Sequence, residues 1–176
     1  GALEDLARAR ALGPAHVSHY QLGLEPGTVF HHRPPAGLPD EDLAAEMQET
    51  AHAQLAAAGY AQYKVSAWAR PGHECRHNLN YWRYGDYLGI GAGAHGKLSH
   101  AGGIVRTVKP KQPREYLAGA GRAELLGSRE PVPPRERPFE FMLNALRLVE
   151  GFRLTDFESR TGLRAAAIAP VLERLE

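Results

Sequence analysis

The residues best able to carry chemistry are gathered in one short segment, residues 72–87. It holds two His, the chain's single Cys, one of its two Trp, three of its seven Tyr and two Arg. A Pro-Gly turn signal at residues 71–72 ends the predicted strand before it, so we expect a loop at the carboxyl end of that strand. Loops lined by aromatic rings and a few polar groups are typical of ligand sites. This segment is therefore the first candidate for a functional site.

Metal binding and nucleophilic catalysis are two of the chemistries open to the segment. His73, Cys75 and His77 alternate and can present nitrogen and sulfur ligands to zinc, although H-x-C-x-H is not a common zinc spacing. Cys75 can also act as a nucleophile with a neighbouring His as its base, but a lone Cys is more often inert.

A heme or another tetrapyrrole is the third chemistry. His77 can bind the iron axially, Tyr81 and Trp82 can stack on the macrocycle, and Arg76 or Arg83 can pair with its propionates. The plain structural alternative is a small aromatic core with histidines at the surface. The residue types alone leave these alternatives open.

A glycine-rich stretch follows at residues 89–96. Gly91, Gly93 and Gly96 match the dinucleotide pattern G-x-G-x-x-G, but the residues after them predict a hairpin and no helix, so we reject a Rossmann site. We expect these glycines to allow close approach of a ligand or of a neighbouring strand. His95 either faces a pocket or has a structural role.

The elements around these segments alternate between helix and strand. Apolar spacing and a cap at Asp40 predict helices at 2–12 and 41–58. Strand-forming residues and turn signals predict strands at 16–24, 62–69, 87–90 and 104–108, with a hairpin turn at 101–103. The strand–helix–strand order suggests a parallel crossover. We therefore predict an α/β fold, either layered or barrel-like.

The composition changes at residues 131–138, where four prolines occur in eight residues. We interpret 129–138 as a stiff linker. Beyond it we predict a helix at 139–149, a second helix started by a capping box at Thr155–Glu158, and a third helix at 164–175. In the first of these helices we expect one apolar stripe to face inward: Phe139, Met142, Leu143, Leu146 and Val149.

The charge balance excludes several classes of protein. Twenty-one basic and 20 acidic residues give a net charge of +1, and a single Cys rules out an intrachain disulfide. The basic residues Arg106, Lys109, Lys111 and Arg114 are interpreted as a solvated face, so we expect no nucleic-acid partner. No apolar run is long enough for a membrane span, so we expect a cytoplasmic protein.

Three stretches carry a family resemblance: residues 16–28, residues 56–97 and residues 137–152. They resemble the radical-SAM heme chaperones of the HemW family, relatives of the oxygen-independent coproporphyrinogen III oxidase. In that family the H-N-x-x-Y-W motif is associated with heme binding, which implies this role for His77, Asn78, Tyr81 and Trp82.

The resemblance also implies a partial radical-SAM (β/α) barrel, S-adenosylmethionine, a 4Fe–4S cluster and a small helical, winged-helix-like domain. Gln21 and His95 are implied contacts of S-adenosylmethionine. The cluster needs three cysteines in C-x-x-x-C-x-x-C, and this chain has one Cys. We expect a fragment in which residues 1–128 are the C-terminal part of the barrel, 129–138 a linker and 139–176 a truncated helical domain.

The function implied by the resemblance is binding of heme and its delivery to acceptor proteins, membrane-bound ones included. The alternative is the oxidase, which decarboxylates porphyrinogen propionates by radical chemistry. Whether the chain has an enzymatic activity is left open.

Overall fold

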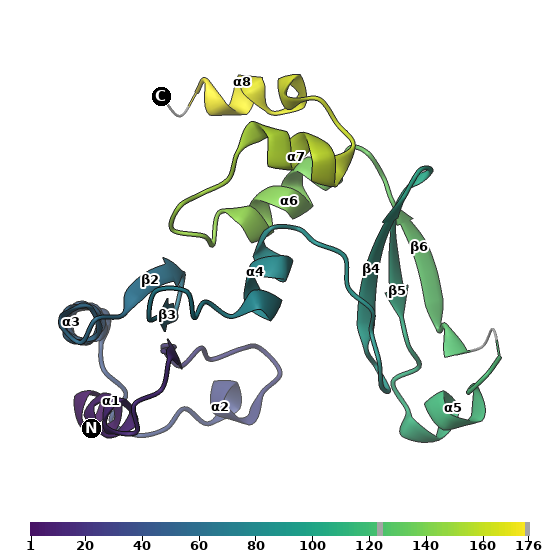
Figure 1. The fold of residues 1–176 in the computed structure, drawn as a ribbon. Coiled ribbons are helices and arrows are strands. Elements are labelled where there is room, and N and C mark those ends of the chain that lie inside the picture. Colours follow the sequence, from purple (N-terminus) through teal and green to yellow (C-terminus); the bar gives the residue numbers. More distant parts are fainter. Residues whose placement is uncertain (123–124, 175–176) are drawn as a thin grey trace. The chain divides into compact units, whose positions relative to one another are not determined.

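The computed structural model describes residues 1–122 and 125–174. These residues form two compact units, residues 1–75 and residues 76–176. Both units combine helices with a three-stranded sheet (Figure 1), which confirms the expected mixed α/β class. No helix among the described residues is both long and apolar enough to cross a lipid bilayer.

The first unit packs two helices against its sheet. In chain order its elements are α1 (Ala2–Ala11), β1 (His16–Ser18), α2 (Val29–His32), α3 (Glu41–Ala57), β2 (Ala61–Lys64) and β3 (Ala67–Ala69). Leu6 of α1, Leu55 of α3 and Trp68 of β3 meet in its apolar core. The helices predicted at 2–12 and 41–58 are confirmed, and the Asp40 side chain accepts a hydrogen bond from the Leu43 amide at 2.9 Å.

The strands of this unit differ from the prediction. The strand expected at 62–69 is two strands, because the chain reverses at Ser66, whose φ is 64°. The sheet order is β1–β3–β2 and both ladders are antiparallel, so β1 and β2 run parallel to each other on either side of β3. The parallel crossover through α3 is therefore present, but an antiparallel strand that was not predicted lies between its two strands. The strand expected at 16–24 ends at Ser18, and Tyr20, Leu22 and Leu24 are exposed. Alternating residues form a strand only where a partner strand lies beside them.

The second unit begins with the short helix α4 (Arg76–Trp82), and its sheet contains β4 (His95–His100), β5 (Gly103–Val108) and β6 (Ser128–Val132). The ladders β4–β5 and β5–β6 are antiparallel, and the hairpin expected around residues 101–103 is confirmed. The strand expected at 87–90 is absent except for an isolated bridge between Tyr87 and Lys97. Residues 129–132 of the expected linker belong to β6, and the domain boundary assigned to 129–138 stays a prediction.

The remaining helices of the second unit are α5 (Pro113–Ala118), α6 (Arg137–Ala145), α7 (Leu154–Thr161), the 3-10 turn η2 (Ala165–Ala167) and α8 (Ala169–Leu172). Phe141 of α6 and Phe157 of α7 pack with Ile104 and Val132 of the sheet and with Ile168. These contacts form the core of the unit.

Two expectations for these helices are wrong. The helix predicted at 164–175 is divided into η2 and α8, because Pro170 has no amide hydrogen for a continuous helix; Leu175 lies outside the described residues. The helix at 154–161 starts at Leu154, one residue before Thr155, and its cap is the carboxylate of Asp156, which accepts a hydrogen bond from the Arg153 amide at 3.4 Å.

The inward face of α6 also differs from the prediction. The side chains buried in the core are Phe141, Ala145 and, just after the helix, Leu148. Four of the residues expected to face inward are mostly exposed: Phe139 at 71%, Leu143 at 55%, Leu146 at 66% and Val149 at 61%. Both sets have helical spacing, so periodicity alone could not select the buried one.

Candidate functional site

Helix α4 carries all four residues of the H-N-x-x-Y-W motif. His77 is exposed, whereas Asn78, Tyr81 and Trp82 are partly buried. Residues four apart on a helix are neighbours on its surface, and the rings of His77 and Tyr81 meet edge to face at 4.8 Å between centroids. The segment expected as a loop is thus partly helical, and the helix brings His77 and Tyr81 together.

Trp82 lies on another side of α4. A helix turns about 100° per residue, so Trp82 is about 140° from His77 around the axis. The guanidinium of Arg147 lies 5.0 Å from the Trp82 ring centroid. Trp82 also lines a pocket of about 500 Å³ together with Phe141 and Leu148. The four motif residues therefore share one helix but do not converge on one face.

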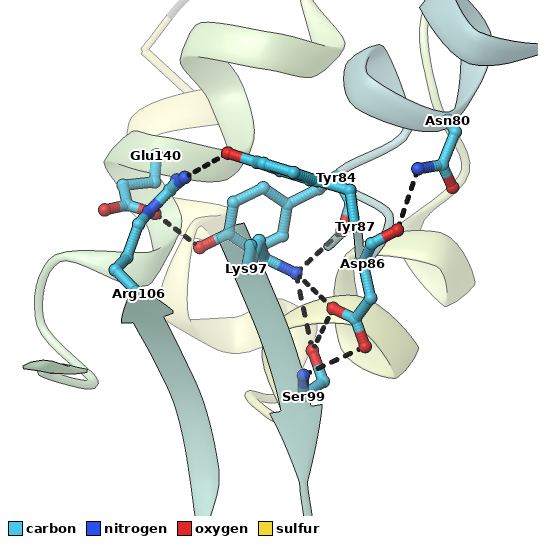
Figure 2. Close-up of polar contacts among 8 residues, drawn as sticks. All are labelled: Asn80, Tyr84, Asp86, Tyr87, Lys97, Ser99, Arg106 and Glu140. Atoms are coloured by element: carbon cyan, nitrogen blue, oxygen red, sulfur yellow. Dashed lines mark hydrogen bonds and ion pairs between the residues drawn. The ribbon is translucent and has the colours of Figure 1, made fainter. Parts of the chain in front are cut away.

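A polar network lies beside α4 and connects it to β5 and α6 (Figure 2). The Tyr84 hydroxyl donates a hydrogen bond to Glu140 Oε2 at 2.7 Å. Arg106 donates from Nη2 to the same oxygen at 2.7 Å and from Nη1 to the Tyr87 hydroxyl at 3.0 Å. Two tyrosines from the segment after α4 are thereby held by one Arg–Glu pair.

A buried lysine closes the other end of this network. Lys97 is 1% exposed, and its Nζ lies 4.0 Å from the centroid of the Tyr84 ring. It donates to the Tyr84 carbonyl at 3.0 Å, to Asp86 Oδ1 at 3.0 Å and to Ser99 Oγ at 3.3 Å. Asp86 also accepts from the Ser99 amide at 2.9 Å. All three ammonium protons therefore have acceptors, as a buried lysine requires.

The pKa values in the network follow its hydrogen bonds. Burial opposes ionisation of Asp86, but the hydrogen bonds from Ser99 and Lys97 together outweigh it and lower its pKa. Burial also opposes ionisation of Glu140, but the hydrogen bonds from Arg106 and Tyr84 together lower its pKa. Burial lowers the pKa of Lys97 and raises that of Tyr84. The two carboxylates are therefore charged at neutral pH.

The zinc interpretation has no support in the described residues. His73 and Cys75 lie in the segment before α4, and Cys75 is a partly buried free thiol. No three His, Cys, Asp or Glu side chains within residues 1–122 and 125–174 are arranged to hold a metal ion.

The glycine-rich stretch serves close packing between strands. A Cβ on Gly96 would lie 2.5 Å from Thr107 Oγ1 of β5, so only glycine fits at this position. This confirms the strand-approach interpretation for Gly96. His95 is exposed at the start of β4, and Gln21 is exposed in the segment after β1. Gln21 belongs to the first unit and His95 to the second, and their contact with S-adenosylmethionine stays a prediction.

Sequence reasoning missed the roles of Arg106, Glu140 and Lys97. Arg106 was expected on a solvated face, but it is partly buried and binds Glu140 and Tyr87. The sequence offered one indication of a buried role for Arg106, its position within a segment predicted as a strand. In the structure it lies opposite Lys97 in the β4–β5 ladder. Nothing in the sequence indicated the role of Glu140, because its partner Arg106 is 34 residues away in the chain.

The comparisons with known proteins point to the family that the sequence resembles. Residues 132–176 match the family model of the HemN C-terminal domain. The chain is 49% identical to the heme chaperone HemW of Haemophilus influenzae over 95% of its length, covering 43% of that protein. It is 47% identical to the heme chaperone HemW of Escherichia coli over 98% of its length, covering 44% of that protein. The chain thus spans less than half the length of these curated relatives.

A solved structure shares the fold. The coproporphyrinogen III oxidase HemN of Escherichia coli, described as a radical SAM enzyme, matches with a TM-score of 0.65 at 17% identity. The match covers 96% of this chain and 43% of that one. At this identity the likeness concerns the fold. At 47% and 49% identity over nearly its whole length, the chain is a homologue of the HemW heme chaperones, of which it spans less than half.

Proposed function

We propose that this chain is the heme-binding part of a heme chaperone, from which heme passes to acceptor proteins. The observation that carries the proposal is the exposed imidazole of His77, held against Tyr81 on α4. Nitrogen of an exposed imidazole is a common axial ligand of heme iron. The curated relatives at 47% and 49% identity are named heme chaperones, which supports the same role here.

Each motif residue has a role in this proposal. His77 is the axial ligand, and Tyr81 provides an aromatic surface beside it. Asn78 orients the ligand by hydrogen bonding, and Trp82 offers an apolar wall at the other end of α4. Arg76 is exposed next to His77 and is the better propionate partner, because Arg83 is already paired with Glu150 at 3.1 Å.

The radical-SAM character of the whole protein is part of the proposal. The chain has one Cys, so its residues do not fit a 4Fe–4S cluster held by three cysteines. Gln21 and His95 are proposed contacts of S-adenosylmethionine. We also propose that the described sheets and helices belong to a partial (β/α) barrel and a winged-helix-like domain, and that the protein acts in the cytoplasm. The oxidase alternative is supported by the fold that the chain shares with the coproporphyrinogen III oxidase HemN.

Hemin titration tests the proposed function. We expect saturable binding with a shifted Soret band, and we expect His77→Ala to lose both because the iron loses its axial ligand. The matched control is His100→Ala, which removes another exposed imidazole of the second unit. Binding by His77→Ala equal to that of the unchanged chain would contradict the assignment of His77.

A further inference from the structure

A continuous series of contacts leads from α6 to the imidazole of His77. It runs from Glu140 through Arg106, Tyr87 and Tyr81 to His77. We propose that Tyr87 and Arg106 are positioning residues, which hold Tyr81 and thereby the imidazole of His77 in the orientation that binds heme iron. This inference rests on the proposed function. It adds to the proposed heme site two residues that hold the axial ligand in place.

The first step is the fixing of Tyr87. Its hydroxyl accepts a hydrogen bond from Arg106 Nη1 at 3.0 Å. Its backbone is bridged to Lys97 in both directions, with the Tyr87 amide donating at 2.9 Å and the Lys97 amide donating at 3.0 Å. Lys97 belongs to β4, which pairs with β5 along its whole length. Tyr87 is therefore held at both ends by the sheet.

The second step passes from Tyr87 to the motif. The rings of Tyr81 and Tyr87 lie 4.3 Å apart at 37°, and the Tyr81 ring meets His77 edge to face at 4.8 Å. An exposed helical side chain is normally free to change rotamer, and the Tyr81 ring limits that freedom for His77.

The third step anchors Arg106. Its Nη2 donates to Glu140 Oε2 at 2.7 Å, and the same oxygen accepts from the Tyr84 hydroxyl at 2.7 Å. Tyr84 is 1% exposed, lies in the apolar core and makes its ring contact with Phe141. Tyr84 therefore supports the Arg–Glu pair from the core.

The consequence for heme follows from preorganisation. Groups that orient a metal-binding imidazole typically affect affinity by about 10-fold to 100-fold when they are removed. Here the orienting contacts are ring packing supported by one charged hydrogen bond, so we expect the lower end of that range. An imidazole that is free to rotate would still bind iron, but in several orientations.

The test compares three tyrosine variants in the chain as it stands, with hemin as the probe. We expect Tyr87→Ala to raise the hemin Kd about 10-fold and to broaden the electron paramagnetic resonance lines of the ferric complex, because His77 is no longer held in one orientation. Tyr87→Phe keeps the ring and loses only the hydrogen bond from Arg106, so we expect a rise in Kd that is smaller than in Tyr87→Ala and similar to that in Arg106→Met. Tyr116→Phe is the control: it removes a hydroxyl that accepts a hydrogen bond from the Gly91 amide at 3.2 Å, outside the series, and we expect it to leave the Kd and the spectrum unchanged.

The outcomes separate the inference from the function beneath it. If His77→Ala abolishes binding while both Tyr87 variants keep the affinity and spectrum of the unchanged chain, the positioning role is overturned and the proposed function stands. If hemin does not bind through His77 at all, both are overturned. Should Tyr87→Ala fail to fold, Arg106→Met keeps every ring and removes the donor to Tyr87, and unchanged binding in that variant would overturn the inference.

Discussion

At the scale of single residues, the most constrained group is the ammonium of Lys97. It is buried with three acceptors around it, and one of them, Asp86, reaches solvent with a side chain that is 38% exposed. A charge in such a place is tolerated only because every proton is used. Lys97 therefore ties the turn after α4 to the sheet.

Replacing this residue tests its structural role. In Lys97→Met the aliphatic stem stays, but the Tyr84 carbonyl and Asp86 lose their donor. We expect a loss of about 2 kcal/mol in the free energy of unfolding, less than for a fully buried pair, because Asp86 can be hydrated. Urea unfolding measures the effect, with the exposed Lys111→Met as the control at under about 0.5 kcal/mol. Equal midpoints for the two variants would show that the network adds nothing to stability.

At the scale of elements, α6 shows how far a pattern predicts packing. Two apolar stripes run along the same segment, one through Phe141 and Ala145 and the other through Phe139 and Leu143. A helix was correctly predicted here from their spacing, but α6 ends at Ala145 and not at Val149. The choice between the stripes depends on Ile104, Val132 and Phe157, which come from other elements. Periodicity contains no information about those partners.

Alanine substitutions on the two faces distinguish the stripes. Phe141→Ala leaves a cavity beside Phe157, and we expect it to cost about 3–5 kcal/mol of unfolding free energy. Leu143→Ala removes a side chain that is 55% exposed, so we expect a change below about 1 kcal/mol. Chemical unfolding of both variants measures the difference. A larger loss for Leu143→Ala would mean that the helix buries the opposite face.

The strands of the first unit show the same limit. The segment 62–69 alternates as a strand should, yet Ser66 adopts a positive φ and turns it into the hairpin of β2 and β3. No Gly or Asn marks that turn, so the usual turn signals were missing. By contrast, Asp40 before α3 and Gly102 in the β4–β5 turn are short-range signals, and the elements they predict are present.

At the scale of the whole molecule, the two hydrogen-bonded carboxylates of the network contribute to the response to acid. The pKa values of Asp86 and Glu140 are lowered from their usual values of 3.8 and 4.5. The unfolded chain therefore takes up these protons at a higher pH than the folded chain does. Their contribution to stability is complete above the usual values and is lost as the pH falls through the lowered ones.

We therefore expect the free energy of unfolding to fall below about pH 4.5 because of these two groups. The double variant Asp86→Asn with Glu140→Gln is expected to be less stable at pH 7 and to lose less on acidification. Urea unfolding at a series of pH values measures this, with Glu130→Gln at an exposed position on β6 as the control. An unchanged acid slope in the double variant would show that other carboxylates dominate.

The sequence by itself determined what depends on neighbouring residues: the helices α1 and α3, the β4–β5 hairpin and the gathering of His77, Asn78, Tyr81 and Trp82 in one segment. Only the tertiary structure decided which face of α6 is buried, where the strand at 62–69 reverses and which groups support His77. The Tyr84–Glu140 hydrogen bond joins residues 56 positions apart, and the Arg106–Tyr87 bond joins residues 19 apart. Such pairs form because folding brings distant elements together, and local spacing does not encode them.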